Sequence, residues 1–100
     1  MNTKITYLYR DASNYKNHGE EIIAGTITTE DLRPYLIENT WFDAAAFGLP
    51  ELYFTPKNED DHLWHELISC TPTPEPPTIK TTSTQILTTL KTTLNKKQIP

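Results

Sequence analysis

The sequence predicts a small α+β domain: a mainly antiparallel four-stranded sheet in the order strand, strand, helix, strand, strand, followed by a C-terminal helix or a flexible tail. Three observations predict this class. Four segments are rich in β-branched and aromatic residues, as strands are. A segment between the second and third of them begins like a helix, with hydroxyl residues followed by acidic ones. The chain has 100 residues, close to the usual size of a single domain.

The first two strands are predicted from residues 4–10 and 20–27. In the first, apolar residues alternate along the chain and share one face: Ile5, Tyr7 and Tyr9. The second carries Gly25 at a possible bulge and follows a turn-rich polar loop. We expect these two strands to pair in antiparallel fashion.

Residues 28–36 are predicted to begin a helix, and their sequence allows two positions for its N-cap. If Asp31 is the N-cap, Pro34 falls in the first turn, where no hydrogen bond is lost. If Thr28 or Thr29 is the N-cap, Pro34 lies deeper and kinks the helix.

The second half of the domain is predicted to hold one more helical piece and two strands. The helical piece covers residues 39–48 and ends at Gly48 as its C-cap. Its large apolar residues would suit an extended segment equally well: Trp41, Phe42 and Phe47. The strands cover residues 51–55 and 62–69, joined by an acidic turn over 56–61. The strand order stays open.

The composition changes near residue 70. All ten aromatic residues precede residue 65, whereas ten of the seventeen threonines lie between Thr71 and Thr93. Residues 1–70 carry a net charge of −7 and the last thirty residues carry +3. We therefore expect a folded domain over 1–70, a proline-rich polyproline II spacer over 71–80, and an amphipathic helix or disordered tail over 81–100.

The final segment has the apolar spacing of a helix. Ser83 is a plausible N-cap, and it precedes a stripe made of Ile86, Leu87, Leu90 and Leu94. Its many threonines weaken a helix because their branched side chains lose rotamer freedom there. The helix would therefore need to dock on the domain or on a second copy of the chain.

The composition also excludes several classes of protein. A net charge of −4 makes nucleic acid an unlikely partner, and the single Cys70 cannot form an internal disulfide. Three isolated glycines match no nucleotide-binding loop, so no cofactor is predicted. The N-terminus leads into a strand-like run instead of an apolar signal region, and no stretch approaches the roughly 20 apolar residues of a membrane span. We expect a cytoplasmic protein without membrane association.

The first candidate site lies at the end of the first strand and in the loop after it. Cationic, aromatic and amide side chains gather there: Tyr9, Arg10, Asp11, Asn14, Tyr15, Lys16 and His18. Such a loop can bind an anion or carry acid–base chemistry. The alternative is structural: Asp11 and Asn14 shape a turn through their side chains, and Arg10 pairs with Asp11 or Glu20.

The second candidate site is the segment DDHLWHE over residues 60–66. On a strand, His62 and His65 point to opposite faces, while His62, Trp64 and Glu66 share one face. The spacing does not match the HExxH pattern of zinc proteases, so no metal site is predicted. A metal held by Asp11, His62 and Glu66 is a weaker hypothesis.

A structural alternative applies to the same segment. Leu63, His65 and Leu67 would point into the core, and Trp64 would cover the other face of the sheet.

Both candidate sites belong to a wider sequence pattern. The motifs Tyr9-Arg10-Asp11-x-x-Asn14-Tyr15-Lys16 and Asp61-His62-x-Trp64-His65-Glu66 are joined by Gly48-Leu49-Pro50-x-Leu52. This pattern, over residues 4–68, resembles a family of short uncharacterised bacterial proteins, seen notably in cyanobacteria. The resemblance implies no activity, cofactor or catalytic residue. It implies that the two candidate sites meet in space.

We expect a non-catalytic binding or regulatory module that acts through protein–protein contacts. Its binding residues would be Tyr9, Arg10, Asn14, Tyr15, Lys16, Trp64 and Glu66. The partner would be another protein, or a second copy bound through the C-terminal segment.

The alternative is a small phosphoester hydrolase or nuclease. Arg10 and Lys16 would hold the anion, and His62 or His65 would be the general base. Asp11 is a further candidate for the catalytic set.

Overall fold

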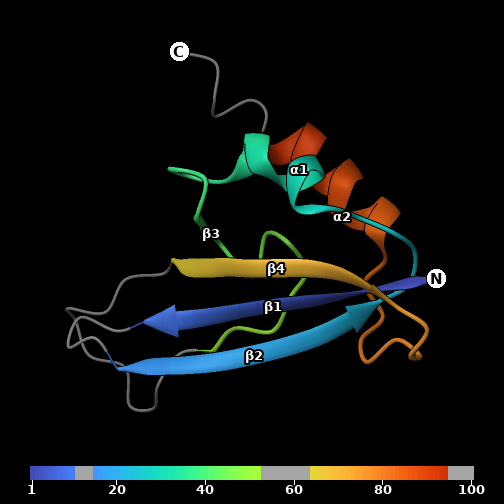
Figure 1. The fold of residues 1–100 in the computed structure, drawn as a ribbon. Helices are drawn as coiled ribbons and strands as arrows, with labels where there is room; N and C mark the ends of the chain where they lie inside the picture. The colour runs from blue at the N-terminus through green and yellow to red at the C-terminus, as the bar shows by residue number, and fades with distance from the viewer. Residues whose placement is uncertain (11–14, 53–63, 95–100) are drawn as a thin grey trace.

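The computed structural model describes residues 1–10, 15–52 and 64–94, and its centre is a four-stranded antiparallel sheet (Figure 1). The strands are β1 (Asn2–Arg10), β2 (Lys16–Ile23), β3 (Trp41–Phe42) and β4 (His65–Thr73), in the order β2-β1-β4-β3. The helices are α1 (Thr29–Leu32), extended by a 3-10 turn over Arg33–Tyr35, and α2 (Ser83–Thr89), extended by a π turn over Leu90–Leu94. The predicted α+β class with a four-stranded antiparallel sheet is confirmed, but the third strand comes from a different segment than predicted.

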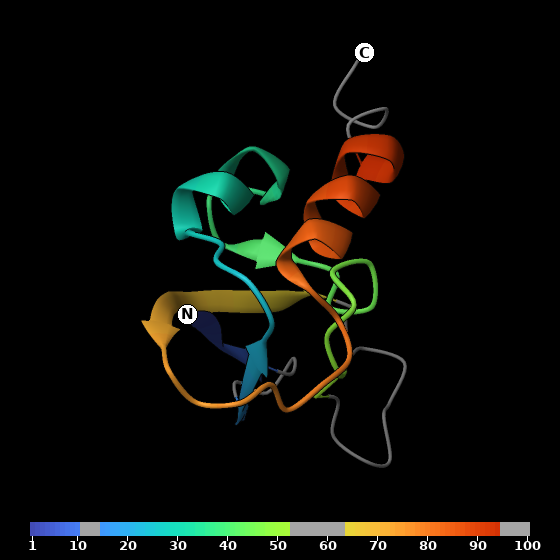
Figure 2. The ribbon, with the colours of Figure 1, turned by 90° about the vertical axis from the view of Figure 1, so that its right-hand side faces the viewer.

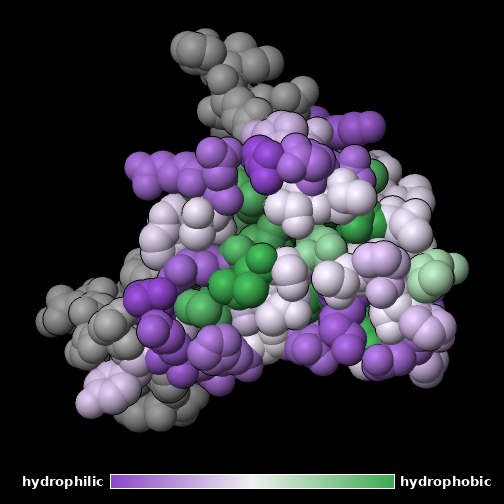
Figure 3. Space-filling view, in the orientation of Figure 1, coloured by the Kyte–Doolittle hydropathy of each residue, from purple (hydrophilic) through white to green (hydrophobic). Residues whose placement is uncertain are grey.

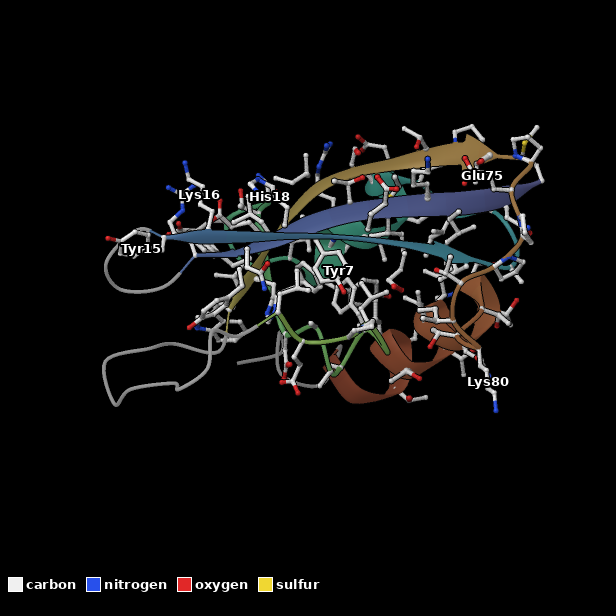
Figure 4. All side chains as sticks on the ribbon, turned by 90° about the horizontal axis from the view of Figure 1, so that it is seen from below. Tyr7, Tyr15, Lys16, His18, Glu75 and Lys80 are labelled. Atoms are coloured by element: carbon white, nitrogen blue, oxygen red, sulfur yellow. The ribbon has the colours of Figure 1, made fainter. Side chains whose placement is uncertain are left out.

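Strand β1, in the interior of the sheet, has alternate side chains on the two faces of the sheet, and these faces differ in what covers them. Its residues Ile5, Tyr7 and Tyr9 are fully buried, as their alternation predicted. They point to the side covered by α2 and residues 43–52, on which Figure 4 shows Tyr7. Among the described residues no helix lies over the other side, and Figure 4 shows Lys16 and His18 projecting from it. We call this side the open face.

Strand β2 begins four residues earlier than predicted. It pairs with β1 in antiparallel register from Arg10 opposite Lys16 to Thr3 opposite Ile23. The polar residues at its start suit a strand because alternate ones face solvent, while the side-chain amide of Asn17 donates to the carbonyl of Leu52 at 2.9 Å. Their low strand propensity is overridden by pairing with β1.

The segment predicted as helical over residues 39–48 is split in two. Trp41 and Phe42 form β3, which pairs with β4, so the extended alternative holds for them. A single turn follows, in which the Phe47 amide donates to the Asp43 carbonyl at 3.2 Å. Gly48 ends this turn with φ +74°, as a C-cap does. Phe42 and Phe47 pack together, with ring centroids 4.6 Å apart.

The other two predictions in this half have different outcomes. Glu51 and Leu52 are not part of a strand, so the predicted third strand is wrong at its start, and its remainder lies outside the described residues. The predicted fourth strand is present as β4, but it runs on to Thr73.

The N-cap of helix α1 is Thr28, one of the two threonines that the sequence allowed at this position. The Thr28 hydroxyl accepts from the Asp31 amide at 3.1 Å, and the Asp31 carboxylate accepts from the Thr28 amide at 3.0 Å. This reciprocal capping box satisfies two amides that a helix start leaves free. Pro34 then converts the helix into a 3-10 turn within two residues of Leu32.

Strand β4 contains a bulge that changes which residues face the core. Thr6 pairs with Ser69, but the next residue, Tyr7, pairs with Leu67, which leaves Ile68 as the extra residue. Leu67 therefore packs against the core on one side of the bulge and Cys70 on the other. Ile68 is left 52% exposed.

The described part of the C-terminal segment, residues 71–94, packs against the rest of the chain, in contrast to the predicted division at residue 70. Residues 71–73, expected in a polyproline spacer, lie in β4 and pair with the start of β1. The rest of the spacer runs along the edge of β2, where the Thr78 amide donates to the Ile22 carbonyl at 2.8 Å (Figure 2). Thr82, one residue before the predicted cap, is the N-cap of α2.

Helix α2 supplies core residues, which corrects the expectation of a detachable arm. Ile86 and Leu90 are 1% and 0% exposed, and Leu87 packs against the same cluster. The helix lies close to the end of β2, because the Ser83 amide donates to the Ala24 carbonyl at 2.9 Å. Gly25 permits this approach: its φ is +89°, and any Cβ there would collide with the Ser83 side chain.

A single hydrophobic core joins all these elements. Its described members come from β1, β2, α1, β3, the 43–49 segment, α2 with its π turn, and the stretches on either side of α1 and its 3-10 turn: Ile5, Tyr7, Ile23, Ile27, Leu32, Leu36, Phe42, Ala44, Phe47, Leu49, Ile86 and Leu90. No helix among the described residues is long and apolar enough to cross a bilayer.

Tyr7 makes stability depend on pH at the alkaline end. Its hydroxyl donates to the Pro50 carbonyl at 2.6 Å, and burial, with a smaller effect from Glu21, raises the pKa of this phenol. Above pH about 10 the unfolded chain loses the proton while the folded chain keeps it, so stability falls as pH rises.

We expect this group alone to lower the free energy of unfolding by about 1.4 kcal/mol per pH unit above pH about 10. Urea denaturation between pH 8 and 11 measures it. Tyr7→Phe should show a smaller slope than the wild type, and Thr84→Ala, which removes no titratable group from the exposed side of α2, should keep the wild-type slope. Equal slopes for wild type and Tyr7→Phe would contradict this prediction.

Candidate functional site

The open face brings together residues from four strands and the turn before β3. The register places one row across it: Ile37 pairs with Trp41, Trp41 with Glu66, Glu66 with Leu8, and Leu8 with His18. Figure 3 looks onto this side and shows hydrophobic groups gathered over the middle of the sheet, with hydrophilic groups along β2. The row therefore mixes apolar and charged groups, of which Leu8 and Glu66 are largely buried and Ile37 and His18 are exposed.

The two predicted candidate sites meet at one ion pair, which joins Glu66 of this row to Arg10 of β1. The Arg10 guanidinium donates from Nε to Oε2 of Glu66 at 2.8 Å and from Nη2 to Oε1 at 3.4 Å. The Glu66 side chain is only 12% exposed, so this bidentate pair is shielded from water on one side. Arg10 thus pairs with Glu66, a partner that was not predicted, while the described partner of Glu20 is Lys4 at 3.7 Å. The other predicted partner, Asp11, lies outside the described residues.

Lys16 adds a second cation at the same end of the open face. It stands directly opposite Arg10 in the β1–β2 register and is exposed. Like charges at such a position repel, and the Glu66 carboxylate offsets this by neutralising Arg10. Of Arg10 and Lys16, Lys16 is therefore the cation that is more exposed to solvent.

A groove of about 420 Å³ lies beside this ion pair. Its described lining consists of Ile37, Glu38, Trp41 and Trp64. Ile37 and Trp41 exchange backbone hydrogen bonds of 2.8 and 2.9 Å across a tight turn, which fixes their side chains next to each other. Trp64 comes from the chain just before β4, two residues from Glu66 and on the same side of the sheet by alternation.

The turn that shapes this groove has an uncommon backbone. Glu38 and Asn39 have φ values of +52° and +61°, in the left-handed region that non-glycine residues seldom adopt. Asparagine tolerates this conformation well and glutamate does so poorly. The fold thus holds an acidic side chain in a strained position at the rim of the groove.

His65 and Tyr9, both predicted site residues, lie on the opposite face of the sheet from Arg10. Both are fully buried, with ring centroids 5.2 Å apart. The His65 Nε2 accepts the backbone amide of Leu52 at 2.9 Å. This fixes the ring within the core and corrects the expectation that His65 and Arg10 act on one substrate.

The remaining predicted site residues are distributed as follows. Tyr15 is 69% exposed just before β2. Asp11, Asn14 and His62 lie outside the described residues, so the metal hypothesis that uses Asp11 and His62 stays untested. Within the described part of the chain, no three His, Cys, Asp or Glu side chains are placed to hold a metal.

Cys70 is a poor nucleophile where the structure places it. It is partly buried on the core side of β4, and burial raises the pKa of its thiol, with Asp31 adding to this and a hydrogen bond with Thr29 opposing it. A raised pKa leaves less of the reactive thiolate at neutral pH.

The sequence analysis missed Ile37, Glu38 and Ile68 and did not assign Trp41 to a site. Ile37 to Trp41 carries a hairpin signal, a turn-forming Asn39 between two β-formers, that could have been read from the sequence. The exposure of Ile68 had no such signal, because it follows from the bulge.

No protein-family model, curated protein or solved structure matches the chain. The resemblance to a bacterial family therefore stays a prediction.

Proposed function

We propose that the protein is a non-catalytic binding module that contacts a partner protein through the open face of its sheet. The observation that carries this proposal is the exposure of large apolar side chains on a surface that also holds a shielded ion pair. Ile68, Trp64 and Ile37 are 52%, 41% and 48% exposed. Exposed apolar residues that gather on one surface are typical of interaction sites, and Ile37 and Trp64 line the same groove.

The residue types on the open face favour a protein as the partner. Tryptophan and arginine dominate the residues that contribute most to protein–protein binding. Here Trp41 stands opposite Glu66, which binds Arg10, and Trp64 lines the same groove as Trp41. The Arg10–Glu66 pair adds a polar group already satisfied within the chain. The face thus has an apolar centre beside charged groups, as interfaces do.

The partner is proposed for the open face because the C-terminal stripe is occupied. Ile86 and Leu90 are buried in the chain's own core, as expected if the helix docks on the domain, so they are not available to a partner or a second copy. Contact through the open face needs no unfolding of α2.

The alternative function, phosphoester hydrolysis, has weaker support. Arg10 and Lys16 do lie side by side on the open face, but Arg10 is engaged by Glu66 and His65 is on the other side of the sheet. His18, on the same face as Lys16, is the described histidine that could serve as base. Hydrolysis of bis(p-nitrophenyl) phosphate by the wild type, lost in His18→Ala, would favour this alternative.

An affinity capture with three versions of the full chain tests the proposed function. Wild type, Ile68→Lys and Thr84→Lys serve as bait for extract of the native host, and captured proteins are quantified by mass spectrometry. Thr84→Lys is the matched control, because it places the same charge on the exposed side of α2.

We expect a set of proteins that the wild type and Thr84→Lys retain equally and that Ile68→Lys loses by about tenfold, since a charge in an apolar contact costs more than about 1.4 kcal/mol. Equal capture by all three baits would overturn the proposal. Light scattering of the free wild type shows whether the partner is a second copy.

A further inference from the structure

The open face carries opposite charges toward its two ends. Strand β2 places Lys16 and Glu20 on this face, because residues an even number of positions apart on a strand point to the same side. Along a strand these two residues are about 13 Å apart. Figure 4 shows Lys16 at one end of the face and Glu75 at the other. A cation and anions are thus separated along the strand direction on one side of the sheet.

The end of the face beyond Glu20 has an excess of negative charge. The Lys4 Nζ lies there between two carboxylates, 3.7 Å from Oε1 of Glu20 and 3.3 Å from Oε1 of Glu75. The Glu20 and Glu75 side chains are 56% and 54% exposed, so both reach the surface. One ammonium group faces two carboxylates, and these three side chains together carry a net negative charge.

The other end of the face presents Lys16. This side chain is exposed and forms no ion pair with another described residue. Arg10 stands opposite Lys16 in the strand register, but Glu66 binds it through both carboxylate oxygens and offsets its charge. Among the described residues, Lys16 is therefore the exposed cation that a partner meets at this end.

Apolar side chains lie between the charged ends. Leu8 pairs with His18, which is midway between Lys16 and Glu20 on β2, and Leu8 is 5% exposed. Ile68, the extra residue of the bulge in β4, is 52% exposed. An apolar centre with charged groups around it is the arrangement typical of protein interfaces.

We propose that the partner at the open face is a second copy of this chain, packed face to face about a two-fold axis that runs across the strands. A two-fold dimer uses the same surface twice, so that surface must be complementary to itself. An axis across the strands brings Lys16 of each copy against the acidic end of the other, whereas an axis along the strands brings like-charged ends together. The strands of the two sheets stay aligned, as in β-sandwiches. This inference rests on the proposed function for the use of the open face.

Reversal of single charges tests this arrangement in the full chain. Lys16→Glu and Glu20→Lys each turn two attractive contacts of the dimer into repulsive ones. We expect each variant to raise the Kd of the dimer about tenfold at low salt, measured by sedimentation equilibrium. Lys80→Glu is the matched control, because it makes the same change of charge at an exposed residue that Figure 4 shows on the α2 side. An equal Kd for the wild type, Lys16→Glu and Glu20→Lys would overturn the inference.

Combining the two reversals distinguishes a second copy from any other partner. The double variant Lys16→Glu/Glu20→Lys has its charges exchanged in both copies, so its Kd should return to within about threefold of the wild type. An equimolar mixture of the two single variants should also dimerise with about the wild-type Kd, since each contact again joins opposite charges. A double variant and a mixture that both stay about tenfold weaker would overturn the proposed axis.

Ile68→Lys connects the dimer to the proposed function. It should raise the Kd of the dimer about tenfold, while Thr84→Lys leaves it unchanged. A wild type that stays monomeric at about 1 mM would overturn the inference. If Ile68→Lys still loses captured proteins in that case, the proposed function stands with a different protein as partner. A monomeric wild type together with equal capture by all three baits would reject both.

Discussion

Removal of residues 75–100 is expected to unfold the protein instead of releasing a folded domain. The deletion takes away Ile86 and Leu90, both almost fully buried in the core. Each such side chain contributes about 1.5–3 kcal/mol by its burial, while a whole domain is stable by only about 5–15 kcal/mol. It also removes the hydrogen bonds from Thr78 and Ser83 to the end of β2.

Circular dichroism and the dispersion of an NMR amide spectrum measure this outcome for the 1–74 chain, which keeps all of β4. A single substitution gives the same test in milder form: Leu90→Ala should lower the free energy of unfolding by about 2–5 kcal/mol. Thr84→Ala, at an exposed position of the same helix, should stay within about 0.5 kcal/mol of the wild type.

A dispersed spectrum for the 1–74 chain would contradict this prediction. It would mean that residues 1–70 fold without the C-terminal segment, as the composition suggested.

Substitution of His65 is expected to destabilise the fold strongly. Its Nε2 is the acceptor for the Leu52 amide at 2.9 Å, and its ring packs among Tyr7, Tyr9 and Phe42. His65→Leu keeps much of the apolar volume but leaves that amide without this acceptor, at a cost of about 1–3 kcal/mol. His65→Ala adds a cavity, so we expect a loss of about 3 kcal/mol or more.

Urea denaturation curves compare these variants with His18→Ala, the matched control. His18 lies on β2 on the open face and is exposed, so its substitution should change stability by less than about 0.5 kcal/mol. If His65→Leu proved as stable as the wild type, the hydrogen bond to Leu52 would contribute nothing to folding.

The same variants distinguish a structural His65 from a catalytic one. His65→Leu that still folds should keep the binding of partners to the open face, because His65 points to the opposite side. This places the main sequence-predicted histidine in the core, as the structural alternative for its segment described.

Local sequence patterns predicted the elements that depend on neighbours along the chain. The alternation of Ile5, Tyr7 and Tyr9 identified β1 and its buried face. The threonine and acidic residues at 28–31 identified a helix start, although not which residue caps it. These features need only the local backbone and its side chains, so a single sequence contains them.

The register of β4 could not be predicted in the same way. Alternation from His65 would place Ser69 inside, but the bulge at Ile68 shifts the pattern, so that Ser69 pairs with Thr6 and Cys70 packs on the core. A bulge is decided by how two strands pair, and Thr6 lies more than sixty residues from Ser69 in the chain.

The sequence by itself determined the α+β class, the buried face of β1, and the presence of an apolar helical stripe near the C-terminus. Only the tertiary structure decided that this stripe belongs to the chain's own core, that His65 and Arg10 lie on opposite faces, and that Trp41 and Trp64 line one groove. The physical reason is that a pattern of apolar residues shows that a surface must be covered, but not what covers it. That choice follows from strand order and packing between distant segments.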